Sequence, residues 1–122
     1  MLAALMAGGA AFSQGAAPVV LRCPGEAAKD PLCEALRAEI EIAAPGRLRS
    51  SEPTGPALVI TLIVTHRTAR EVEARVDWTG PAHGASGSGP PVMATVADAP
   101  QLGRTAMRSL ARGILEVSGL PL

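Results

Sequence analysis

The sequence has almost no aromatic residues: among its 122 residues there is one Phe, one Trp and no Tyr. A core must therefore be built from Ala, Val, Leu and Ile side chains. Platforms that stack the bases of single-stranded nucleic acids need exposed aromatic rings, so the composition excludes a site of that kind. Net charge is lacking as well, because eleven basic and eleven acidic residues cancel. Without a surplus of basic residues, nucleic acid is not an expected partner.

Cysteine and histidine are equally scarce, with two of each in the chain. A structural zinc site takes about four such ligands at close spacing. Cys23 and Cys33 lie far along the sequence from His66 and His83. The two cysteines are also too widely spaced for the C-x-x-C pattern of a redox site. The sequence therefore predicts no metal site and no bound cofactor.

The N-terminal residues 1–17 carry no charge and are almost wholly small or apolar. The run from Leu2 to Phe12 has the length of the apolar region of a signal peptide and is too short to cross a bilayer. The small residues Ala11 and Ser13 favour cleavage after Ser13, although no Lys or Arg precedes the apolar run. The alternative is a buried N-terminal helix, but a run of Ala and Gly packs poorly. We expect export, with one domain over residues 18–122 and no membrane span within it.

Export decides how the cysteine pair is interpreted. In an oxidising compartment, Cys23 and Cys33 are expected to form a disulfide across a short loop. The alternative is a reactive thiol at Cys33. Asp30-Pro31 has the form of a helix N-cap followed by proline, which places Cys33 in the first helical turn, where the helix dipole favours a thiolate. We predict the disulfide, and with it a periplasmic or secreted location.

Hydrophobic patterns predict the element order β-α-β-β-β-α. In residues 71–78, EVEARVDW, apolar and polar residues alternate, as in a strand with one solvated face. Residues 57–66, ALVITLIVTH, are rich in β-branched residues and favour a central strand. The other predicted elements are strands at 18–22 and 91–97, a helix at 31–44, and a helix at 99–117 capped by Asp98. Segments 46–56 and 80–91 are rich in Pro, Gly and small polar residues and are predicted to be loops.

This order indicates an α+β fold. We expect a two-layer sandwich in which both helices cover one face of a mostly antiparallel, four-stranded sheet. The first strand is followed by a helix, so it is expected to lie parallel to a later strand through a right-handed crossover.

Two surface features are candidates for binding a partner. Arg104, Arg108 and Arg112 are spaced four apart and form a positive ridge on the last predicted helix. This ridge is either a docking site for an acidic surface or a solvated face, with Arg112 placed to meet Glu116. Trp78 ends the apolar side of its strand, so it is either a core residue or an interface anchor.

Catalytic signals are weak throughout the chain. His66 and His83 have no Ser or Cys at a spacing typical of a catalytic motif, and neither G-x-S-x-G nor a phosphate-binding loop occurs. We therefore predict no catalytic residue. The leading hypothesis is a small exported, non-enzymatic protein that binds a partner, an envelope protein or another acidic surface, in the bacterial periplasm or envelope. The alternative is a small periplasmic hydrolase or thiol enzyme that uses His83 or Cys33.

Overall fold

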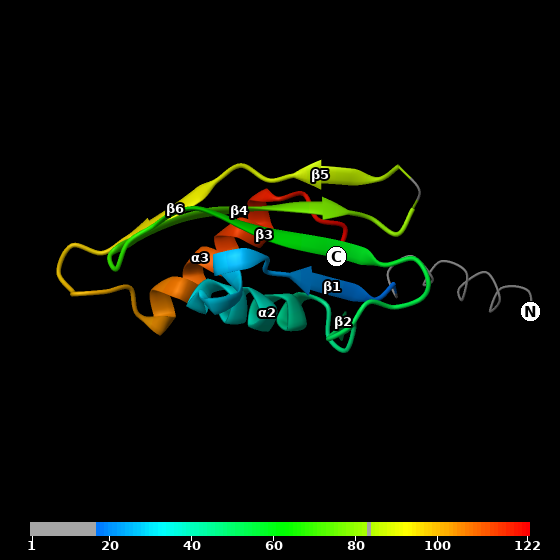
Figure 1. Cartoon of the computed structure of the whole chain (residues 1–122), viewed down its shortest axis with the longest axis horizontal. Coiled ribbons are helices and arrows are strands. Elements are labelled where there is room, and N and C mark those ends of the chain that lie inside the picture. The colour runs from blue at the N-terminus through cyan, green and yellow to red at the C-terminus, as the bar shows by residue number, and fades with distance from the viewer. Residues whose placement is uncertain (1–16, 83) are drawn as a thin grey trace, which may run out of the picture.

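The structure, a computed structural model, describes residues 17–82 and 84–122. The predicted signal peptide, with its cleavage point after Ser13, lies outside the described residues apart from Ala17, and so does His83. Within the described residues the fold is α+β, with a mixed sheet and two α-helices (Figure 1). The predicted fold class is confirmed.

The helices and strands follow the predicted order, with three short additions. β1 spans Val19–Arg22, the 3₁₀-helix η1 spans Gly25–Lys29, and α2 spans Pro31–Ala43. They are followed by β2 (Leu48–Arg49), β3 (Leu58–Arg67), β4 (Glu71–Thr79), β5 (Ser86–Ser88), β6 (Val92–Thr95) and α3 (Arg104–Val117).

The sheet has more strands than predicted, and it is mixed. Its order is β2-β1-β3-β4-β5, with β6 also paired to β4. β1 lies parallel to both β2 and β3, whereas β4 is antiparallel to β3, β5 and β6. The prediction of four mostly antiparallel strands was therefore only partly right. The missed strands, β2 and β5, are very short and lie in segments predicted to be loops, where pairing with a neighbour outweighs local propensity.

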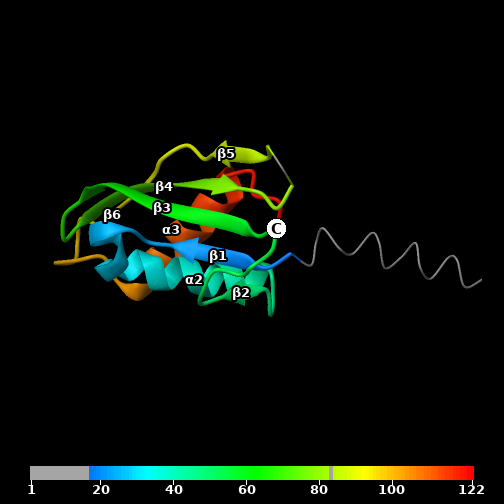
Figure 2. The same ribbon diagram turned by 45° about the vertical axis from the view of Figure 1, so that its right-hand side comes forward.

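The core lies between one face of the sheet and the helices, which the turned view shows together on that face (Figure 2). The alternating strand β4 buries Val72, Ala74 and Val76 completely, as its pattern predicts. These side chains form one cluster with the inner residues of β1 and β3 and with the buried residues of both helices. The helical contribution comes chiefly from Leu32, Leu36, Ile40, Met107, Leu110 and Ile114.

The start of α2 agrees with the sequence signal. The Asp30 side chain accepts a hydrogen bond from the Leu32 backbone N–H at 2.9 Å, and Pro31 occupies the first turn. Proline is well placed there because the N–H it lacks has no partner within the helix. This cap fixes the direction in which the chain leaves η1.

α3 begins later than predicted, at Arg104, and the predicted N-cap Asp98 is an exposed residue outside the helix. The N-cap is Gly103, which provides no side-chain hydrogen bond. The backbone N–H of Leu102 donates instead to the carbonyl of Ala69 at 2.9 Å. This hydrogen bond to the β3–β4 turn keeps the segment before Gly103 outside the helix.

Candidate functional site

Two of the three ridge arginines meet on one buried carboxylate. Arg108 donates from Nε and Nη2 to Oε2 of Glu39, at 3.2 and 2.9 Å. Arg112 donates from Nε to Oε1 of the same residue at 3.2 Å. Glu39 lies on α2 and is only 5% exposed. Arg108 and Arg112 therefore join α3 to α2 in addition to lining the surface.

The environment of Glu39 favours its ionised form. Burial by itself raises the pKa of Glu39, because a carboxylate is poorly solvated inside a protein. The hydrogen bonds and positive charges of Arg108 and Arg112 outweigh burial, so the net pKa lies below its ordinary value. The charged carboxylate holds both guanidinium groups in fixed positions on the face of α3.

Sequence reasoning missed Glu39, although a signal was present. Glu39 follows Leu36 by three residues and precedes Ile40, so it falls within the apolar side of the predicted helix. A carboxylate at such a position needs a cationic partner. Arg112, expected to meet Glu116 on its own helix, pairs with Glu39 instead.

The ridge keeps positive charge directed to solvent. Arg112 uses only Nε in its contact, and its side chain is 59% exposed, so its terminal nitrogens remain available. Arg104 is exposed and forms no ion pair within residues 17–82 and 84–122. It is the first residue of α3, where the helix dipole disfavours a cation and favours an anion. This end of the ridge is therefore suited to an acidic group.

Around the start of α2, the described residues form three hollows that all include Pro31 in their lining. The ridge hollow, about 520 Å³, is bordered by Arg104 and Arg108. The edge hollow, about 520 Å³, lies between η1 and β3. The turn hollow, about 480 Å³, lies between these two and shares Leu102 with the ridge hollow and Arg67 with the edge hollow. The three hollows are therefore neighbours around Pro31, with Arg67 and Leu102 standing between them.

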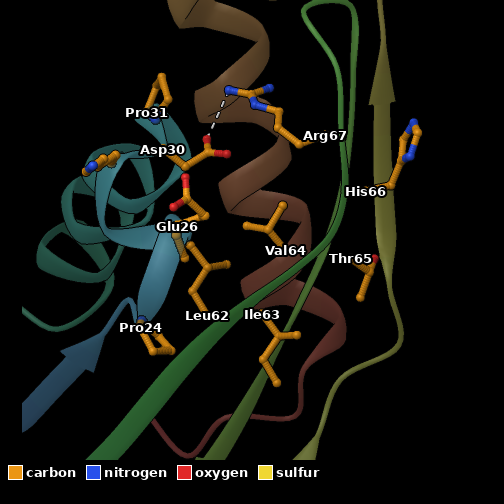
Figure 3. Close-up of a pocket in the computed structure, with 12 residues that line it drawn as sticks. Pro24, Glu26, Asp30, Pro31, Leu62, Ile63, Val64, Thr65, His66 and Arg67 are labelled. Carbon is orange, nitrogen blue, oxygen red and sulfur yellow. Dashed lines mark hydrogen bonds and ion pairs between the residues drawn. The ribbon is translucent and has the colours of Figure 1, made fainter.

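The edge hollow has an apolar floor and a charged rim. Figure 3 shows Leu62 and Val64 on the side of β3 that faces η1, with Thr65 and His66 on the other side. At the rim, Arg67 reaches across to Asp30 and forms an ion pair with it at 3.0 Å. The hollow is a shallow surface depression and could accommodate a side chain or a short chain segment.

Trp78, the second candidate for partner binding, makes internal contacts. Its indole N–H donates to the carbonyl of Ser118 at 3.1 Å, next to the end of α3. The ring also lies against Gly87, where an added Cβ would come within 2.8 Å of three indole atoms. Trp78 is partly buried and packs against the core. These contacts favour its role in packing, while a role in binding stays a prediction.

The residues considered for catalysis are not assembled into a reactive site. Cys23 and Cys33 form the predicted disulfide, with their Cα atoms 6.2 Å apart, so Cys33 carries no free thiol. His66 contacts Glu71 at 3.0 Å on an exposed part of the sheet. His83 lies outside the described residues. Thiol chemistry at Cys33 would first require reduction of the disulfide.

Within the part of the chain that the structure describes, no group of three or more His, Cys, Asp or Glu side chains is placed to hold a metal ion. No helix among those residues has the length and apolar character needed to cross a membrane. No protein-family model matches the chain, and comparison with curated proteins finds no match either.

Proposed function

We propose that this protein is an exported, non-enzymatic domain that binds an acidic partner in the bacterial periplasm or envelope, through the arginine ridge of α3. The observation that carries the proposal is the arrangement of Arg104, Arg108 and Arg112. Two of these cations are fixed by buried Glu39. The third forms no ion pair among the residues that the structure describes, and it lies at the end of α3 that favours an anion. A fixed guanidinium loses less conformational entropy on binding a carboxylate than a flexible one.

The disulfide supports the location. Disulfides form and persist in oxidising compartments such as the periplasm and are rare in the cytosol. The bond between Cys23 and Cys33 is therefore compatible with a periplasmic or extracellular protein. It also supports a binding role, because it holds η1 close to the start of α2, where the edge hollow lies.

Affinity capture from an envelope extract, repeated over a range of salt concentrations, tests the proposal. Exposed charges are screened over roughly 8–10 Å near physiological ionic strength. A partner that docks on the ridge should be captured at low salt and released as the salt concentration rises. Capture that is indifferent to salt would place the binding surface elsewhere on the molecule.

A further inference from the structure

β6 is an outer strand of the sheet, and its free edge has no strand beside it. Within the described ranges 17–82 and 84–122, β6 pairs with β4 alone (Figure 1). Met93 is 50% exposed and Thr95 is exposed as well, so this edge is accessible to solvent. Sheet edges are usually protected by charged side chains, and β6, with the sequence Val-Met-Ala-Thr, contains none. The edge is therefore open to pairing with another strand.

The register identifies the backbone groups that face outward. The Val96 N–H donates to the carbonyl of Arg70 at 3.0 Å, so the polar backbone groups of Val96 point toward β4. Ala94 continues the same antiparallel register and has the same orientation. Successive residues of a strand point their backbone groups in opposite directions, so the N–H and carbonyl groups of Met93 and Thr95 point away from the sheet.

α3 adds apolar surface beneath the same edge. A Cβ added to Gly113 would lie 3.8 Å from the Val92 side chain of β6. Ala106 and Val117 recur at helical spacing from Gly113 and lie on the same side of α3. Val117 is 47% exposed. This side of the helix carries no charge, because the ridge arginines lie on the opposite side, next to α2.

The fold of a single copy does not account for Gly113. Glycine in the middle of a helix destabilises it relative to alanine. The φ angle of Gly113 is not positive, and the added Cβ would make only an ordinary contact with Val92. Alanine would therefore fit at this position. Glycine differs from alanine in allowing another polypeptide backbone to approach the helix closely.

We propose that β6 pairs with β6 of a second copy of this chain, antiparallel and across a two-fold axis beside Ala94. Met93 then lies opposite Thr95 of the second copy, and each outward N–H meets an outward carbonyl. The uncharged edge is suited to pairing with itself because no like charges meet, and the chain as a whole has no net charge. The pairing leaves the arginine ridge exposed and does not depend on the proposed function.

The geometry favours a closed pair that also involves α3. Four paired residues bury less than the roughly 800 Å² per partner of a stable interface, so the apolar side of α3 must be covered as well. The two-fold axis of an antiparallel strand pair is perpendicular to the sheet, which places both α3 helices on one face, with Gly113 and Val117 directed toward the second copy. Pro90 and Pro91 precede β6 and confine the pairing to this short stretch.

Sedimentation velocity of the oxidised protein, from micromolar to millimolar concentration, tests the proposal. We expect a reversible equilibrium between monomer and dimer that does not weaken as salt rises, because the interface is uncharged. Thr95→Pro should weaken dimerisation about tenfold, since it removes an outward N–H and leaves the bonds to β4 in place. Ser86→Pro is the matched control. The carbonyl of Ala85 accepts the Gly80 N–H, so the next residue, Ser86, has its N–H on the free edge of β5, outside the proposed pair.

Two further measurements keep the test decisive if Thr95→Pro does not fold. Gly113→Ala should fold more stably than the wild type and still weaken dimerisation severalfold, because the added Cβ separates the two helices. Hydrogen exchange at the Met93 and Thr95 amides, followed by NMR, should slow as the dimer forms. A monomer at every concentration overturns the proposal. So does a dimer that is released by salt, that neither Thr95→Pro nor Gly113→Ala weakens, or that grows into larger open-ended assemblies.

Discussion

Arg67 donates from Nη2 to Oδ1 of Asp30 at 3.0 Å, and this oxygen also accepts the Leu32 backbone N–H at 2.9 Å. The Asp30 side chain is only 6% exposed. One carboxylate therefore caps α2 and holds the end of β3 against it, beside the edge hollow that Asp30 and Arg67 both line.

Replacing Asp30 with Ala should destabilise the domain by about 1–2 kcal/mol, because the helix loses its cap and Arg67 loses its partner. Asp98→Ala is the matched control, since Asp98 is exposed and caps no helix. It should change stability by no more than about 0.5 kcal/mol. Urea denaturation of the two variants measures both effects, and equal losses would contradict the assigned caps.

Glu39→Gln should reduce the dependence of stability on acid pH. The pKa of Glu39 is lowered in the folded state, so its ionised form stabilises the fold above the ordinary carboxyl pKa of about 4.3. This stabilisation is lost as the pH falls from about 4.3 through the lower pKa that Glu39 has in the folded state. The wild type should lose more stability than the variant in this range. Glu116→Gln, at an exposed position, should leave the wild-type slope unchanged, and thermal denaturation between about pH 6 and pH 3 measures all three proteins.

Gly87→Ala should disturb the packing around Trp78. The new Cβ would lie 2.8 Å from the indole ring, so either the ring or β5 must move. We expect a loss of about 1–3 kcal/mol, together with a change in the emission of the single tryptophan. Gly55→Ala is the control, because nothing lies within 4 Å of its added Cβ. Identical emission and stability in both variants would show that Trp78 does not lie on Gly87.

The native protein should be exported and oxidised. Mass spectrometry of protein isolated from its own cells should find a chain that begins after Ser13 and contains no alkylatable thiol. Reduction should lower the free energy of unfolding by about 2–3 kcal/mol, because the loop between Cys23 and Cys33 is no longer closed. A chain that retains Met1 and two reactive thiols would contradict export.

Local signals in the sequence were sufficient for much of the fold. Asp30-Pro31 marks the start of α2, and the alternation in EVEARVDW identifies β4 and its buried face. Each signal comes from neighbouring residues of a single helix or strand, so it can be recognised in the sequence without knowledge of tertiary contacts. Asp98 was misleading because its segment is held by the β3–β4 turn through Leu102, a contact between distant parts of the chain.

The site depended more heavily on tertiary contacts. The spacing of Arg104, Arg108 and Arg112 was visible in the sequence. That two of them are anchored, while Arg104 has no ion pair in the described part of the chain, depends on Glu39, which is distant in sequence. The edge hollow was not predictable, because it lies where η1 packs beside β3 beyond the last paired residue of β1. Only the register between β1 and β3 shows where that pairing ends.

The central claim is that the ridge docks an acidic partner, and Arg104 is the residue at which to test it. Reversing Arg108 or Arg112 would also remove a partner of buried Glu39 and so confound binding with stability. Arg104→Glu avoids this problem, since a carboxylate at the start of α3 should leave the helix intact or slightly more stable. Arg49→Glu makes the same charge change on β2, away from the ridge.

The most direct measurement is the amount of partner that each of these two variants captures from an envelope extract at low salt, compared with the wild type. We expect Arg104→Glu to weaken binding about three- to tenfold, as loss and reversal of one exposed charge contact should, while Arg49→Glu binds as the wild type does. Equal capture by both variants, with both folded, would contradict docking on the ridge.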